Sequence, residues 1–121
     1  MSWKSIRLEL ARTPEFPGGS ASRAYVIRLP VNDDGLIDEE AVKENTAMAR
    51  VRRFWPNERD MSGYVIKTPK GWAFSYRVGE DDDETIFLLD RHVILPGEYI
   101  TLTEPDGSQL PFRIATVQDL N

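Results

Sequence analysis

The chain has 121 residues, a net charge of −5 and no cysteine. A chain of this length fits one domain with one core, so residues 1–121 are expected to form a single β-rich domain. The lack of cysteine excludes disulfides, iron–sulfur clusters, thiolate zinc sites and cysteine nucleophiles. Because no apolar run approaches the ~18 residues needed to cross a bilayer, and the first residues lack a signal-peptide core, we expect a soluble, cytoplasmic protein without membrane contact.

Two strands are predicted in the first third of the chain. Apolar residues occupy every second position in residues 3–12 and again in residues 23–31, the pattern of strands with one buried face. Residues 13–22 between them are rich in proline, glycine and serine and predict a loop. Asn32-Asp33-Asp34-Gly35 has the composition of a turn. The chain therefore begins as a pair of strands.

One short helix is predicted at about residues 38–46. Asp38 belongs to the residue types that cap a helix N-terminus, and the two glutamates that follow it interact favourably with the positive end of the helix dipole. Ile37 and Val42 have the spacing of a hydrophobic staple around such a cap. The apolar helical spacing stops after Glu44, which limits the helix to about two turns.

Two hairpins are predicted in the second half, over residues 64–76 and 99–117. Each contains a proline followed by a glycine, in Pro69-Lys70-Gly71 and Pro105-Asp106-Gly107, which are suited to a tight turn. Residues 85–95 between them are apolar and expected to be extended. These elements predict a mainly β fold, namely a small single-domain antiparallel barrel or strongly bent sheet of about seven strands with one short helix.

Catalytic and metal sites find little support in the sequence. His92 is the only histidine, and no Gly-x-Ser-x-Gly motif accompanies it, so we expect it to be structural rather than catalytic. The acidic run at residues 80–84 lacks the alternating aspartates of a calcium-binding loop and is expected to be a solvated loop. The alternative is a small enzyme or ligand-binding barrel that uses His92 and carboxylates. We expect no metal site.

A flavin is not expected either. Leu95-Pro96-Gly97-Glu98-Tyr99 and the residues after it resemble the "PGQY" strand of the flavin-binding barrel in ferredoxin-reductase-like enzymes. That resemblance would imply a neighbouring Arg-x-Tyr-Ser/Thr element that holds the flavin. This chain has Phe112-Arg113-Ile114-Ala115 there instead, so the sequence predicts a barrel hairpin and no cofactor.

The sequence ARVRRFW contains the strongest candidate for a binding surface. If it forms a strand, Arg50, Arg52 and Phe54 share one face while Arg53 and Trp55 share the other, because side chains alternate. Two guanidinium groups on one face can clamp an anion with paired hydrogen bonds. The alternative is that these arginines pair with acids of the same protein, such as the acidic run.

Aromatic residues offer a second candidate. Trp72, Phe74 and Tyr76 alternate along a strand, which is typical of a core face, although such a stripe can also stack nucleic-acid bases. Whether Trp55 contributes to a binding surface or to the core depends on whether its side chain is exposed.

Three functions remain open from the sequence. We favour a noncatalytic protein-binding or adaptor domain with a protein partner. The first alternative is a nucleic-acid or phosphate-ligand binder that uses Arg50, Arg52, Phe54 and the Trp72 stripe. The second alternative is a small ligand-binding barrel or enzyme that uses His92 and carboxylates.

Overall fold

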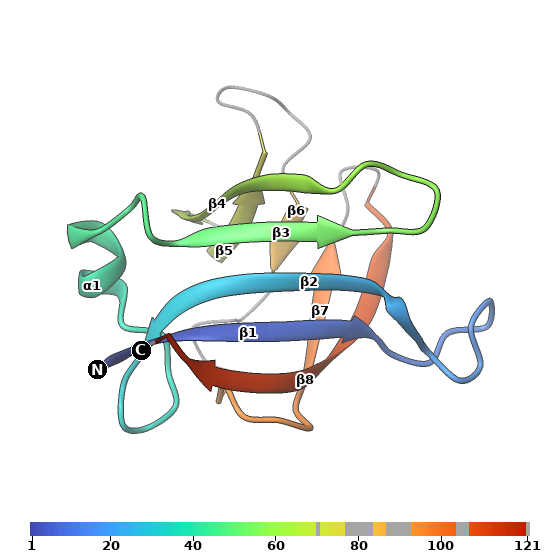
Figure 1. Cartoon of the computed structure of the whole chain (residues 1–121), viewed down its shortest axis with the longest axis horizontal. Helices are drawn as coiled ribbons and strands as arrows, with labels where there is room; N and C mark the ends of the chain where they lie inside the picture. The colour runs from blue at the N-terminus through green and yellow to red at the C-terminus, as the bar shows by residue number, and fades with distance from the viewer. Residues whose placement is uncertain (70, 77–83, 87–92, 104–106, 121) are drawn as a thin grey trace.

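The computed structural model describes residues 1–69, 71–76, 84–86, 93–103 and 107–120, which contain eight strands and one helix (Figure 1). In chain order these are β1 (Ser2–Leu10), β2 (Ser20–Val31), α1 (Glu39–Glu44), β3 (Arg50–Phe54), β4 (Met61–Thr68), β5 (Gly71–Ser75), β6 (Glu84–Ile86), β7 (Tyr99–Thr103) and β8 (Gln109–Asp119). No helix in these described ranges is long and apolar enough to span a membrane.

The strands form a closed antiparallel barrel in which each strand pairs with its neighbours in chain order. β8 closes the barrel against β1, with Ile6 opposite Val117, while the other edge of β1 pairs with β2, where Ile6 is opposite Ile27. The predicted antiparallel barrel with one short helix is therefore confirmed, with one strand more than expected. The pairings thus run from β1 through β8 and back to β1.

The barrel interior is filled by apolar side chains from alternate positions of the strands. Tyr25, Phe74 and Phe112 are fully buried, and the Tyr25 ring contacts the other two, with ring centroids 5.2 Å apart for Tyr25 and Phe74 and 5.1 Å apart for Tyr25 and Phe112. Burying a side chain of this size contributes about 1.5–3 kcal/mol. The alternation that predicted β1 and β2 is thus the alternation between this core and the outer surface.

The turn and helix between β2 and β3 form as the sequence predicts. The side chain of Asn32 accepts hydrogen bonds from the N–H groups of Asp34 and Leu36, and Gly35 adopts a φ of 81° that favours glycine. The Asp38 carboxylate then accepts a hydrogen bond from the Ala41 N–H and caps α1. The capping prediction is confirmed, and α1 lies at one end of the barrel (Figure 1).

Two elements differ from the sequence prediction. β2 begins at Ser20, inside the predicted loop, because Ser20 pairs with Leu10 across a register shift in β1. Of the segment predicted to be extended at residues 85–95, Thr85 and Ile86 belong to β6, residues 93–95 belong to no strand, and residues 87–92 lie outside the described residues. Composition does not reveal a pairing partner, and it is the partner that defines where a strand begins and ends.

Candidate functional site

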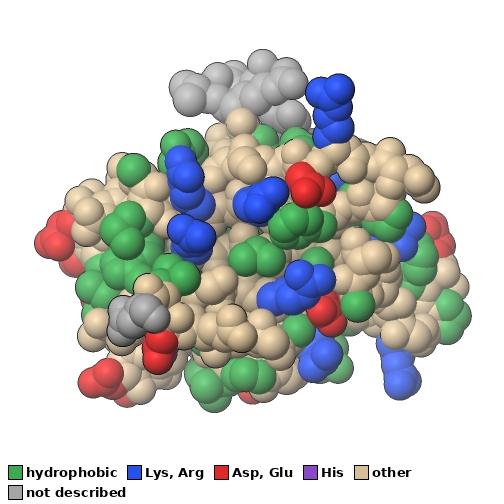
Figure 2. Space-filling view, in the orientation of Figure 1, with side chains coloured by type: hydrophobic (Ala, Val, Ile, Leu, Met, Phe, Trp, Pro, Cys, Tyr) green, Lys and Arg blue, Asp and Glu red, His purple; other side chains and the backbone are tan. Residues whose placement is uncertain are grey.

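Three arginines lie on the outer face of β2 and β3. Arg50 and Arg52 project outward because Val51 between them is buried, and Arg28 projects outward from β2 between two buried residues. Arg28 and Arg50 stand next to the Ile27–Val51 pair on the two strands, so they are close neighbours. We call Arg28, Arg50 and Arg52 the arginine face. Figure 2 shows Lys and Arg side chains gathered over these strands.

A cleft of about 440 Å³ opens on the arginine face. Its floor comes from small side chains on the three strands β1, β2 and β4, namely Ser5, Val26 and Ser62. The register places Arg52 directly opposite both Val26 and Ser62, and Arg50 opposite Tyr64. Long side chains therefore surround a floor of short ones, which is why the outside of the barrel is hollowed there.

The arginine face carries more positive charge than its acidic neighbours balance. The Arg52 guanidinium lies 3.6 Å from the Asp60 carboxylate, and both side chains are about half exposed. Neither Arg28 nor Arg50 has an acidic partner among the residues that the structure describes. Because neighbouring like charges repel each other, an anion bound between these arginines would be stabilised.

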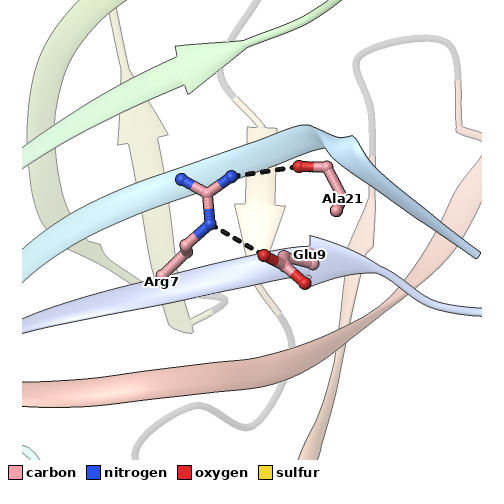
Figure 3. A network of polar contacts seen from close by, with 3 residues as sticks. All are labelled: Arg7, Glu9 and Ala21. Carbon is pink, nitrogen blue, oxygen red and sulfur yellow. Dashed lines mark hydrogen bonds and ion pairs between the residues drawn. The ribbon is translucent and has the colours of Figure 1, made fainter.

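Arg7 on the neighbouring strand β1 differs from Arg28 and Arg50 because its guanidinium group has an acidic partner. Its Nε donates a hydrogen bond of 2.8 Å to the Glu9 carboxylate, and its Nη2 donates one of 3.0 Å to the backbone oxygen of Ala21 (Figure 3). These contacts hold the guanidinium against β1 and β2. Arg7 therefore borders the arginine face with its charge already paired to Glu9.

Two aromatic rings flank the arginine face, and each lies beside one of its arginines. The Arg50 guanidinium lies 5.5 Å from the centre of the Tyr64 ring, with its Nη2 3.4 Å from the Tyr64 hydroxyl oxygen. The Arg52 guanidinium lies 5.1 Å from the centre of the Phe54 ring. Such contacts orient the guanidinium groups.

Arg53 and Trp55 lie on the other side of β3, as the alternation predicts. The Arg53 side chain is only 12% exposed, and its Nε donates a hydrogen bond of 3.3 Å to the Tyr25 hydroxyl. Its guanidinium lies 4.2 Å from the centre of the Trp55 ring and 3.1 Å from the Glu58 carboxylate. Arg53 therefore belongs to the scaffold, and Trp55 stands at the end of the barrel rather than on the arginine face.

The other predicted site residues do not join the arginine face. Trp72 is 1% exposed and lies in the core with Phe74, so its ring is not presented at the surface for stacking. His92 and residues 80–83 of the acidic run lie outside the described residues. The acids that pair with Arg52 and Arg53 in the described chain come instead from the turn between β3 and β4.

Sequence analysis missed two members of this surface, Arg28 and Tyr64. Arg28 has the alternation of an outward residue in β2, yet nothing in the sequence states that β2 lies beside β3. Tyr64 begins a predicted hairpin but its pairing with Arg50 depends on the register between β3 and β4. Strand order and register would have been needed to find them.

Among the described residues, no group of three or more His, Cys, Asp or Glu side chains is arranged to hold a metal ion. No protein-family model, curated protein or solved structure matches this chain. The arginine face is therefore interpreted from its own chemistry.

Proposed function

We propose that this protein is a noncatalytic binding module whose arginine face receives an acidic segment of a protein partner. The observation that carries the proposal is the position of Arg28 and Arg50, which are close neighbours without an acidic partner in the described chain. Guanidinium groups bind carboxylates through paired hydrogen bonds. A partner that supplies carboxylates would satisfy these donors and remove their mutual repulsion.

Carboxylates fit this surface better than the bases and phosphates of a nucleic acid. Single-stranded nucleic acids gain much of their affinity by stacking bases on aromatic rings. On this surface Phe54 is only partly exposed, and Arg50 and Arg52 lie beside the rings of Tyr64 and Phe54. A net charge of −5 also opposes the approach of a long polyanion, whereas a short acidic segment contacts only the local positive patch.

The surface continues beyond the cleft, which favours an extended partner over a small ion. A second groove of about 620 Å³ lies between α1 and the β4–β5 hairpin, and Tyr64 borders both it and the cleft. Val42 and Ile66 supply apolar walls in this groove, and Lys67 adds a positive charge, whereas Lys43 already lies beside Glu39 and Glu40. Because both grooves are lined by side chains, we expect a partner to be held mainly through side-chain contacts.

The proposal is tested by fluorescence anisotropy with a labelled oligoglutamate peptide and a labelled oligothymidylate of equal charge. The unmodified protein is expected to bind the peptide more tightly than the oligothymidylate. The double variant Arg28→Ser with Arg50→Ser should weaken peptide binding by about tenfold or more, which corresponds to about 1.4 kcal/mol. The single variants Arg28→Ser and Arg50→Ser are compared with Arg113→Ser, which removes the same charge from an exposed arginine on β8.

Two results would overturn the proposal. Equal loss of peptide binding in the Arg113→Ser control would show that only the total charge matters. Tighter binding of oligothymidylate, with a steep dependence on salt, would assign the arginine face to nucleic acid instead.

A further inference from the structure

The end of the barrel that carries the β1–β2 loop holds a second cavity, distinct from the arginine face. It has a volume of about 530 Å³, within the usual range for small-molecule sites. Its walls include Arg12, Phe16, Arg23, Trp55, Leu110 and Pro111. We call this cavity the barrel mouth. It shares no lining residue with the cleft of the arginine face.

The loop that forms one side of the barrel mouth is held by its own hydrogen bonds. The Thr13 and Phe16 backbones exchange two hydrogen bonds of 3.0 and 3.1 Å, and the Phe16 N–H also donates to the Thr13 hydroxyl at 3.0 Å. The Gly19 N–H donates to the Phe16 oxygen at 2.8 Å. A wall built in this way needs little ordering when a ligand binds, which lowers the entropic cost of binding.

An aromatic wall connects the barrel mouth to the core. The Trp55 ring contacts two buried rings, with centroid distances of 6.4 Å to Tyr25 and 6.5 Å to Phe112. Trp55 itself is only partly buried and lines the cavity. Leu110 and Pro111 extend this apolar surface from β8. An apolar or aromatic group entering the mouth would therefore meet a preformed apolar wall.

Positive charge lies at the rim of the barrel mouth. The Arg23 guanidinium is 4.1 Å from the centre of the Phe16 ring and 5.9 Å from that of Trp55, and its Nη1 donates a hydrogen bond to the Ser20 hydroxyl. Arg12 is exposed and has no ion pair within the described parts of the chain. Glu15 also lines the cavity and opposes an anion there.

We infer that the barrel mouth binds a small aromatic carboxylate. The ring of such a ligand would pack against Trp55 and Leu110, and its carboxylate would accept hydrogen bonds from the guanidinium groups at the rim. A preformed apolar cavity with a few convergent charged groups is the usual form of a small-ligand site, and barrel mouths are a common place for one. This site is independent of the acidic partner proposed for the arginine face.

The test uses 3-phenylpropionate and its neutral analogue 3-phenylpropan-1-ol, titrated into ¹⁵N-labelled protein. The chain has three tryptophans, and the variant Trp55→Phe identifies the indole N–H signal of Trp55. We expect 3-phenylpropionate to shift that signal in a saturable way and the alcohol to bind at least about fivefold more weakly. The Arg28→Ser variant serves as the control, because Arg28 lies on the arginine face.

Variants at the rim give opposite expected effects. Arg12→Ser should weaken binding of 3-phenylpropionate by about threefold or more, and Glu15→Gln should strengthen it by about twofold, since each changes one charge beside the ligand carboxylate. Equal binding of the acid and the alcohol would overturn the proposed anion recognition. A saturable shift that leaves the Trp55 signal unchanged would place the ligand elsewhere and overturn the site itself.

Discussion

Loss of an arginine should destabilise the protein on one side of β3 and have almost no effect on the other, and the structure gives the size of this difference. Arg53→Ser removes two buried methylene groups, worth about 1.6 kcal/mol. It also removes the hydrogen bond to Tyr25 and the contact with the Trp55 ring, each worth about 0.5–1 kcal/mol. The Glu58 pair adds little because Glu58 is 52% exposed. The expected loss is about 3 kcal/mol.

Arg52→Ser makes the same chemical change on the outer face and should have almost no effect. Its side chain is 57% exposed, and the weak attraction to Asp60 is offset by relief of repulsion from the neighbouring arginines. The free energy of unfolding should change by no more than about 0.5 kcal/mol.

Thermal unfolding followed by circular dichroism measures both variants. For a domain of this size the Arg53→Ser loss corresponds to a fall in Tm of about 10 °C. Arg53→Met keeps most of the buried chain and should lose about half as much. Equal Tm values for the Arg52 and Arg53 variants would refute the assignment of Arg53 to the scaffold and Arg52 to the surface.

Three further predictions concern the surface charge, a close backbone contact and the helix cap. Replacing Arg28 or Arg50 by Thr should raise Tm slightly at low salt and leave it unchanged at high salt, because screening already removes the repulsion that the substitution relieves. Gly63→Ala should cost several kcal/mol or prevent folding, since its Cβ would lie 2.2 Å from a backbone oxygen of β5, whereas Gly18→Ala, with nothing within 4 Å, should be nearly neutral in a urea titration. Asp38→Ala should lower the free energy of unfolding by about 1 kcal/mol and Asp38→Asn by clearly less, and equal losses would contradict the capping role.

Local chemistry explains why much of the fold was predictable. The alternation in β1 and β2, the Asp38 cap and the two Pro-x-Gly hairpins depend on residues close together in the chain. The division of β3 into an outward Arg50–Arg52 side and an inward Arg53 side follows from the same alternation, because successive side chains of a strand point to opposite faces. These features need no knowledge of the rest of the molecule.

Contacts between distant segments decided everything else. The arginine face depends on β2 lying beside β3 in a register that brings Arg28 next to Arg50, and the barrel mouth depends on a loop near residue 16 meeting Trp55. From the sequence alone Trp72 could belong to a surface or to the core, and in the closed barrel its side chain is buried. A sequence specifies the periodicity of each strand through local sterics, but which strands become neighbours depends on the packing energy of the whole chain, and a binding surface built from several strands exists only once that packing is complete.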